Sequence, residues 1–267
     1  MNITEIKQKI ENGAFDKDFS MLYGDVNAAR ARYTAACDSF CDIFSERDNI
    51  RLFSAPGRTE VGGNHTDHQH GCVLAGGVNL DVIAVVAPNN DGKVRIKSEG
   101  YDMDTVDIRK LEKDESEHGR ASALIRGVLS RFKELGCTLS GFNAYTTSNV
   151  LKGSGLSSSA AFEVLVGNIV NGMFFEARAD EITVAKIGQY AEREYFGKPC
   201  GLLDQMASSL GGFTYADFFD PAEPITEKIN LDIHSFGYTL CVVDTGGNHA
   251  NLTQDYADIT IECKKIS

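Results

Sequence analysis

A polar run from Pro56 to Gly71, with the sequence PGRTEVGGNHTDHQHG, gathers side chains that could do chemistry. Its histidines and Asp67 are ligand types found in zinc and iron sites. The histidine spacing lacks the i, i+4 pair of a helical zinc site, and the glycines favour a loop. Asparagine, histidine and aspartate together supply many hydrogen-bond donors and acceptors. We therefore favour a loop that contacts a hydroxyl-rich ligand.

A second stretch, GSGLSSS from Gly153 to Ser159, precedes a long apolar run. Its glycines let the backbone approach a ligand closely. Free N–H groups at a helix start, together with serine hydroxyls, would form an anion site. The alternative is a serine-capped helix after a flexible turn. The stretch lacks the Gly-Lys-Ser/Thr ending of a Walker A loop, so a nucleotide would be bound by another architecture.

A third stretch, GLLDQMASS, sets Asp204 among apolar residues, twelve positions after Glu192. A carboxylate in apolar surroundings is costly unless it is paired or hydrogen-bonded. Such a residue is a candidate general base. The alternative is an aspartate that only caps a helix or forms an ion pair.

Apolar periodicity predicts the helices that would position these groups. We expect helices over 27–49, over 120–136, after the loop within 153–175, and over 179–197, where Asp180 would be the cap. The buried face of the first helix would hold Ala28, Tyr33, Cys37, Phe40, Cys41 and Phe44.

Strand signals alternate with these helices. Residues 51–56 and 138–150 are predicted strands, and 236–246 reads as a buried strand. Residues 76–98 are predicted to form a hairpin across the turn sequence NNDG. Residues 1–24 are polar and would pack as an extension. The interleaved pattern favours a mixed α/β or α+β domain.

The chain of 267 residues is 42% hydrophobic and 24% charged, enough for a substantial core. A formal charge of −12 argues against a nucleic-acid partner, although a nest of backbone N–H groups could still bind an anion. Seven cysteines without a CxxC pair favour reduced thiols in a cytosolic protein. No apolar run predicts a signal peptide or a membrane span. The sequence does not specify an oligomeric state.

Together the three stretches resemble the GHMP kinase superfamily and, within it, the galactokinase family. APGRTEVGGNHTDHQHG is similar to the galactokinase signature, and GSGLSSSAAFEV to the ATP-binding loop. AEREYFGKPCGLLDQ resembles the segment with a metal-binding glutamate and the catalytic aspartate. HANLTQDYADITIEC resembles the region of the substrate tyrosine. Their order and spacing agree from about residue 50 onward.

The resemblance implies a role for each matching position. Asp204 would be the catalytic base, and Arg58 would keep it ionised and stabilise developing charge. Glu192 and Ser159 would hold Mg²⁺, and Ser98 would lie near the nucleotide base. The sugar would be lined by Asn64, His65, Asp67, Gly201 and Tyr256. The ATP phosphates would lie against Gly153, Ser154, Gly155, Leu156, Ser157, Ser158 and Ser159.

The implied fold is α+β, that of the GHMP kinase N-terminal domain (ribosomal protein S5 domain 2-like), with a mixed sheet and helices. Residues 1–50 would form an N-terminal extension and helix packed on this domain, which would span 51–267. The final residues, DITIECKKIS, read as the middle of a helix. We therefore expect a fragment truncated before a C-terminal domain, able to fold but weakly active by itself.

The implied function is ATP-dependent phosphorylation of the anomeric hydroxyl of galactose, giving galactose 1-phosphate, in the cytoplasm. Asn64 stands where the family signature has glutamate, so another hexose or an amino sugar is an alternative substrate. A non-catalytic sensor that binds sugar and ATP is a further alternative. The presence of Arg58, Ser159, Glu192 and Asp204 argues against the sensor.

Overall fold

The computed structural model of the protein describes residues 1–150, 153–243, 258–259 and 262. The α-helices of this part are α1 (Ile3–Glu11), α2 (Asp16–Tyr23), α3 (Val26–Ile43), α4 (Ala121–Glu134), α5 (Ser158–Phe174), α6 (Glu181–Tyr190) and α7 (Leu203–Leu210). The strands are β1 (Arg51–Gly62), β2 (Cys72–Asn89), β3 (Lys93–Ser98), β4 (Met103–Asp107), β5 (Gly141–Ser148), β6 (Phe213–Asp217) and β7 (Ile225–Ile229).

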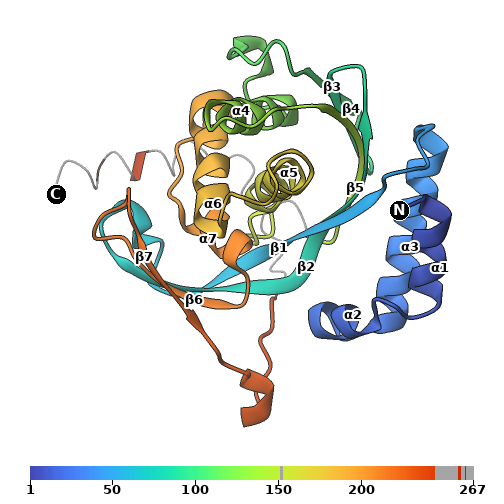
Figure 1. Cartoon of the computed structure of the whole chain (residues 1–267). Coiled ribbons are helices and arrows are strands. Elements are labelled where there is room, and N and C mark those ends of the chain that lie inside the picture. The colour runs from blue at the N-terminus through green and yellow to red at the C-terminus, as the bar shows by residue number, and fades with distance from the viewer. Residues whose placement is uncertain (151–152, 244–257, 260–261, 263–267) are drawn as a thin grey trace.

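One mixed sheet organises the molecule, with strand order β4-β3-β5-β2-β6-β7 and with β1 paired to β2. The long strand β2 pairs with β5 through residues 82–89 and with β6 through residues 72–76. β3 runs parallel to β5, whereas β1, β5 and β6 all run antiparallel to β2. Figure 1 shows the sheet curving around α5, so β2 is the strand that joins its two halves.

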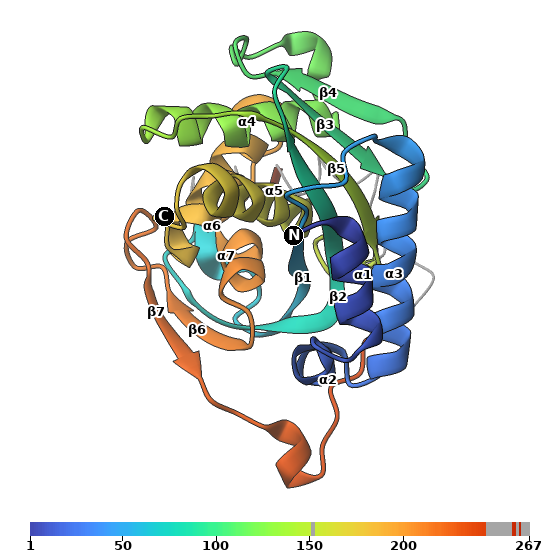
Figure 2. The same ribbon diagram turned by 45° about the vertical axis from the view of Figure 1, so that its right-hand side comes forward.

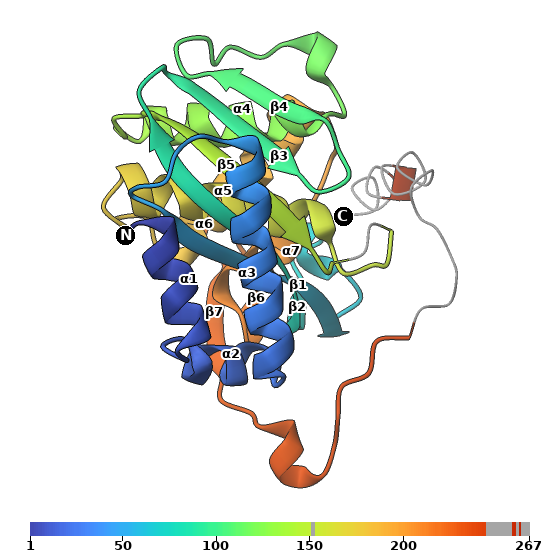
Figure 3. The same cartoon turned by 90° about the vertical axis from the view of Figure 1, so that its right-hand side faces the viewer.

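Helices cover both faces of the sheet. α4, α5, α6 and α7 lie inside its curve, while α1, α2 and α3 cover the outer face (Figures 1 and 3). The alternation of β2 serves both layers: Val82, Ala84 and Val86 belong to the core with α4 and α5, and Ile83 and Val85 to the core with α1 and α3. A strand that is buried on both faces reads as a continuous apolar run, as this one does.

Side-chain caps start two of the three N-terminal helices, α1 and α3. Asn2 and Glu5 make a capping box at α1, and the Asp25 side chain accepts the Ala28 N–H at 2.9 Å at the start of α3. α1 lies alongside α3, and α2 crosses beside one end of the pair (Figure 2). The polar composition of residues 1–24 hid α1 and α2 from the sequence prediction, since the buried residues there are only Ile3, Ile6, Ile10 and Phe19.

The helices predicted from periodicity are confirmed, with shifts at their ends. α3 ends at Ile43, and Ala29 rather than the predicted Ala28 is buried on its inner face. Asp180 caps α6 through the Thr183 N–H at 2.7 Å, as predicted. α6 then continues as a π-helix over Ala191–Phe196, a form that often marks functional sites.

Two strand predictions were wrong. β2 and β3 do not form a hairpin, because β5 is inserted between them and pairs with both. The NNDG turn therefore joins two strands that are not neighbours. Residues 237–243 of the predicted strand 236–246 are not a strand in the described part of the chain, and most of their side chains are exposed. A strand needs a partner for its backbone groups, and the described residues provide none there.

Gly127 allows the π-helix to lie directly on α4. A Cβ at Gly127 would stand 2.7 Å from the Ala191 Cα, closer than real contacts allow. Tyr195 holds the same junction, since its hydroxyl donates to the Leu111 carbonyl at 2.9 Å. This close contact fixes the segment that carries Glu192. Among the described residues, no helix is long and apolar enough to cross a membrane.

Candidate active site

Arg58 from β1 and Asp204 from the first turn of α7 are directly paired. Arg58 Nε and Nη2 donate to Asp204 Oδ1 at 2.8 and 2.6 Å. Ser157 Oγ donates to Asp204 Oδ2 at 2.6 Å. The Asp204 side chain is 27% exposed, whereas that of Arg58 is 7% exposed. A buried arginine thus holds a carboxylate that a ligand can still reach.

These contacts decide the ionisation of Asp204. Burial opposes its negative charge, but the Arg58 charge and the hydrogen bonds from Ser157 and Arg58 outweigh burial and lower the pKa of Asp204. The carboxylate is therefore ionised at neutral pH. A positioned, ionised and accessible carboxylate can accept a proton from a bound hydroxyl, which is the chemistry of a general base.

The glycine-serine loop is fastened to β1 by the same arginine. The Arg58 backbone N–H donates to the Leu156 carbonyl at 3.0 Å, and Nη1 donates to the Gly155 carbonyl at 2.5 Å. Gly153 and Gly155 have φ angles of 76° and 77°, a region that glycine adopts without strain. α5 begins at Ser158, so its first N–H groups and the positive end of its dipole lie beside this loop.

The serines of the loop face two different carboxylates. Ser157 is the N-cap residue of α5 at φ 58°; its side chain makes no capping bond, and its hydroxyl donates to Asp204. Ser159 Oγ donates to Glu192 Oε1 at 3.3 Å. Ser154 and Ser158 are half-buried between them. The loop therefore links the predicted base to the predicted metal carboxylate.

Glu192 lies on the π-helix with its side chain only 3% exposed. Its Oε1 accepts from Ser159 and, at 3.0 Å, from Lys198 Nζ, while Oε2 accepts from Gln205 Nε2 at 2.8 Å. A serine hydroxyl and a carboxylate oxygen suit Mg²⁺, which usually takes one or two protein ligands beside substrate phosphates and waters. A cationic group already rests on Glu192 Oε1, so this oxygen is a position where positive charge is favourable.

Three partners of Glu192 were missed by the sequence reasoning. Gln205 Nε2 also donates to Glu163 Oε2, at 2.9 Å, and both side chains are fully buried. Burial, together with the Glu192 charge, raises the pKa of Glu163 well above its ordinary value. The available signal was a single acid in the apolar run FEVLVGNIV.

Lys198 is the third missed residue, in the loop after the π-helix. Burial opposes its charge, but Glu192 outweighs that effect and raises the pKa of Lys198. No sequence signal separates this lysine from a surface lysine.

Asp67 and Gly201, both predicted to line the sugar, are in contact. Asp67 is buried and accepts the Leu203 N–H at 3.1 Å through Oδ2. A Cβ at Gly201 would lie 1.6 Å from the same Oδ2, so only glycine leaves room for the carboxylate. Asp67 thereby ties the polar loop to the start of α7, one residue before Asp204.

Asn64 and His65 lie in the exposed part of the polar loop. Both have left-handed backbones, with φ angles of 55° and 53°. The His65 N–H donates to Glu60 Oε1 at 2.8 Å, which orders the turn. In the described part of the chain, no three His, Cys, Asp or Glu side chains gather as a metal cluster.

The two other predicted residues stand apart from this arrangement. Ser98 ends β3 and accepts the Thr146 hydroxyl at 2.9 Å, and no contact joins it to the paired groups above within the described residues. Tyr256 lies outside the described residues, as does most of the segment HANLTQDYADITIEC.

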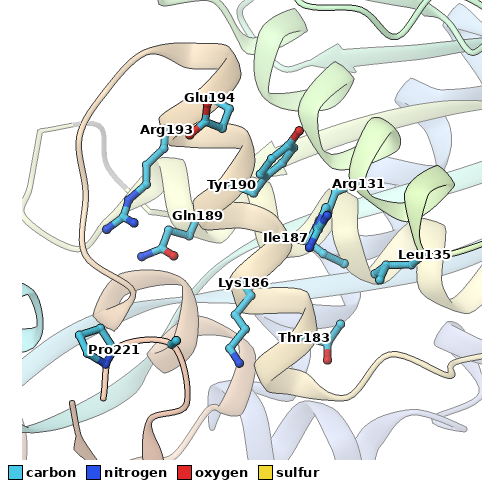
Figure 4. A pocket seen from close by; sticks show the side chains of 11 residues that line it. Arg131, Leu135, Thr183, Lys186, Ile187, Gln189, Tyr190, Arg193, Glu194 and Pro221 are labelled. Atoms are coloured by element: carbon cyan, nitrogen blue, oxygen red, sulfur yellow. The ribbon is translucent and has the colours of Figure 1, made fainter. Parts of the chain in front are cut away.

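One hollow borders the site, and another lies apart from it. One of about 590 Å³ is lined by Asp67, Gly201, Cys200 and their neighbours. The other, about 330 Å³, lies along the outside of α6, where Lys186 and Tyr190 point to its wall (Figure 4). Of the described residues, the paired groups of the site line neither hollow. The first hollow therefore meets the site only through Asp67 and Gly201.

Comparison with known proteins agrees with this geometry. The family model of the GHMP kinases N terminal domain matches residues 123–212, and the galactokinase galactose-binding signature matches residues 38–88. The galactokinase of Streptomyces coelicolor is 32% identical over 215 residues, covering 80% of this chain and 55% of the relative. That of Lactobacillus helveticus is 34% identical over 217 residues, covering 79% and 55%. The chain thus spans little more than half the length of these relatives.

Comparison with solved structures also points to the galactokinases. The crystal structure of Lactococcus lactis galactokinase complexed with galactose superposes with a TM-score of 0.68 at 25% identity, covering 75% of this chain and 52% of that one. The Methanococcus jannaschii mevalonate kinase shares the fold, with a TM-score of 0.60 at 14% identity. The chain carries a GHMP kinase N-terminal domain and shares its fold with a galactokinase. It is similar to the galactokinases, whose galactose-binding signature it contains.

Proposed function

We propose that this chain is part of a galactokinase, which transfers a phosphoryl group from ATP to the anomeric hydroxyl of galactose and gives galactose 1-phosphate. The pairing of Arg58 and Asp204 beside the start of α5 carries the proposal. It sets a charged base next to a natural phosphate site. The similarity to galactokinases over four-fifths of the chain supports the choice of sugar.

Asp204 accepts the proton of the anomeric hydroxyl as the oxygen attacks the γ-phosphorus. Arg58 keeps Asp204 ionised and places positive charge where the transferring phosphoryl group gains negative charge. Ser157 holds the second carboxylate oxygen, so the base presents a fixed orientation. Positioning of this kind supplies much of the rate of phosphoryl transfer.

The nucleotide phosphates lie against the loop from Gly153 to Ser159, where glycine backbones and the first N–H groups of α5 face them. Ser98 lies toward the nucleotide base. Glu192 and Ser159 would hold Mg²⁺, which would neutralise charge on the phosphate oxygens. Gln205 fixes the Glu192 carboxylate in place by its bond to Oε2.

The sugar lies against the polar loop. Asn64, His65, Asp67, Gly201 and Tyr256 form its contacts in this proposal. Asp67 and Gly201 meet at the edge of the larger hollow, which supports a polar ligand at that place. Asn64 offers an amide in place of a carboxylate, so one sugar hydroxyl is held by a weaker, neutral hydrogen bond.

The proposal also covers the organisation of the chain. Residues 1–50 are an extension packed on the domain formed by 51–267, and the cytoplasm is the site of action.

A panel of sugars tests the function. ATP consumption by the full-length protein is followed with galactose, glucose, mannose, galactosamine and 2-deoxygalactose, with and without Mg²⁺, and the product is identified by phosphorus NMR. Galactose 1-phosphate as the main product supports the proposal. A different preferred sugar changes the substrate but keeps the kinase. Binding of sugar and ATP without turnover of any sugar would identify a sensor instead.

A further inference from the structure

The Lys198 ammonium rests on the carboxylate to which the proposed function assigns the metal. Lys198 Nζ lies 3.0 Å from Glu192 Oε1, the oxygen that also accepts from Ser159 at 3.3 Å. The Lys198 side chain is 38% exposed, against 3% for Glu192. The ammonium therefore reaches a buried carboxylate from a partly exposed loop. It neutralises that charge in the absence of a metal.

We propose that Lys198 is a resident cation on Glu192 that Mg²⁺ must displace, and that this lysine thereby weakens metal binding. The inference rests on the proposed function, since it takes Glu192 and Ser159 as the metal ligands. It goes beyond the proposed function by assigning Lys198 a role in setting the affinity of this site for Mg²⁺.

The contacts of Glu192 place both cations at the same carboxylate oxygen. Oε2 is held by Gln205 Nε2 at 2.8 Å in a fully buried pair, whereas Oε1 is the oxygen that the predicted metal ligand Ser159 contacts. Oε1 is the oxygen next to Ser159 and the start of α5. Mg²⁺ requires ligand oxygens at about 2.0–2.1 Å in a near-octahedral shell, which an ammonium on the same oxygen would disturb by sterics and by like charge.

The position of Lys198 lets it leave. It follows Gly197, which ends the π-helix at φ 84°, and its long side chain is already partly in solvent. Glu192 keeps Ser159 and Gln205 as partners after the lysine departs. Exchange of one cation for another thus needs only a change of side-chain rotamers.

Metal binding to the purified chain, measured without any assay of turnover, tests the inference. Mn²⁺ serves as the probe, titrated by electron paramagnetic resonance in the presence of a non-hydrolysable ATP analogue. Lys198→Met removes the charge and keeps the length of the side chain. We expect its Kd for Mn²⁺ to fall about fivefold, the effect of one partly exposed ion pair. Lys198→Arg keeps the charge and should stay close to the unaltered chain.

Lys186→Met is the matched control, because Lys186 pairs with Glu223 at 3.3 Å on the outside of α6. It should leave the Kd unchanged. A Kd for Lys198→Met that is unchanged or raised overturns the inference, and a raised value would mean that the lysine assists the metal or the phosphates. Melting curves with and without Mn²⁺ show whether each variant is folded.

Glu192→Gln separates this inference from the proposed function. If Mn²⁺ binding does not depend on Glu192, or if no chain binds Mn²⁺, the metal site itself is wrong and both fail. If binding depends on Glu192 but is indifferent to Lys198→Met, the inference alone fails.

Discussion

Asp81 and Asp204 are each bound by an arginine and by hydroxyl groups, yet they differ in exposure. Asp81 accepts from Arg32, from Ser54 and, at 2.6 Å, from the Tyr23 hydroxyl, and its side chain is 4% exposed. The side chain of Asp204 is 27% exposed. Asp81 lies at the junction of β2 with α1–α3, where every donor comes from the protein.

Both carboxylates are tied to β1. Asp81 stands opposite Pro56 in the β1–β2 register, two residues before Arg58. Asp81 faces α2 and α3, and Asp204 faces the glycine-serine loop. The comparison teaches that the same donor types either stabilise a junction or prepare a base. The difference is whether one side of the carboxylate is left for a ligand.

The largest expected effect is on stability, in Asp81→Asn. The change leaves the Arg32 guanidinium, 16% exposed, without its counter-ion, which should lower the free energy of unfolding by about 3 kcal/mol. Urea denaturation followed by circular dichroism measures it. Asp16→Asn is the control, because Asp16 pairs with Arg30 at the surface and should cost under ~1 kcal/mol. If both variants lose the same free energy of unfolding, Asp81 contributes no more to stability than a surface ion pair does.

Asp204→Asn should act mainly on turnover. An amide cannot accept the proton, so galactose-dependent turnover of the full-length protein should fall by ~10²-fold or more. The free energy of unfolding should fall too, because Arg58 loses its counter-ion, but by less than in Asp81→Asn, since the Asp204 side chain is 27% exposed against 4% for Asp81. The affinity for an ATP analogue should change little. Asp18→Asn on the exposed side of α2 serves as the control. Near-normal turnover would remove Asp204 from the role of base.

Tyr23→Phe sharpens the comparison on the structural side. It removes a hydroxyl that donates to Asp81 at 2.6 Å and lies 2.9 Å from that of Tyr33. Loss of a hydrogen bond to a charged group predicts a decrease of about 1.5 kcal/mol in the free energy of unfolding, with turnover per folded molecule unchanged. Tyr101→Phe, at an exposed position, should have no effect. A change in turnover would mean that the contacts around Asp81 also affect the geometry of the active site.

Ser157→Ala is the smallest change and the counterpart of Tyr23→Phe. Without the Ser157 hydroxyl the pKa of Asp204 rises, so the acid limb of turnover against pH should move to higher pH. A lowered pKa stabilises the folded state above the ordinary aspartate pKa of about 3.9, and this contribution is lost as pH falls through the folded-state pKa. The variant should therefore lose up to ~1 kcal/mol at neutral pH. Ser158→Ala should leave the limb in place, and an unmoved limb in Ser157→Ala would contradict the assignment.

The sequence predicted the helices and the strongest pairings of this site for a physical reason. Helical periodicity is local, so α4, α5 and α6 were visible from their own residues. The signatures around Arg58, Ser159 and Asp204 are also local, and the fold brings these three segments together. What each side chain contacts was not visible, as with the Ser157 hydroxyl, which bonds to Asp204 rather than capping α5.

The errors came from contacts between distant parts of the chain. The hairpin over 76–98 satisfied every local rule, but β5, which begins at Gly141, takes the place between its strands. The network of Glu163 and Gln205 joins residues 42 positions apart, and no spacing rule covers such a pair. The capping box at Asn2 and the helical spacing of Ile3, Ile6 and Ile10 were readable in principle, yet the polar composition of residues 1–24 hid α1 and α2.

The pairings of β2 also bear on the order in which the chain can fold as it is synthesised. Its residues 82–89 can pair once β5 has emerged, whereas residues 72–76 must wait for β6, which begins at Phe213. Segments close in sequence meet first because closing a long loop costs entropy before any contact repays it. β1 with Arg58 is therefore placed early, and α7 with Asp204 arrives among the last elements. Until β6 arrives, residues 72–76 of β2 are paired with β1 on one edge only, and an open strand edge of this kind makes a nascent chain prone to aggregation.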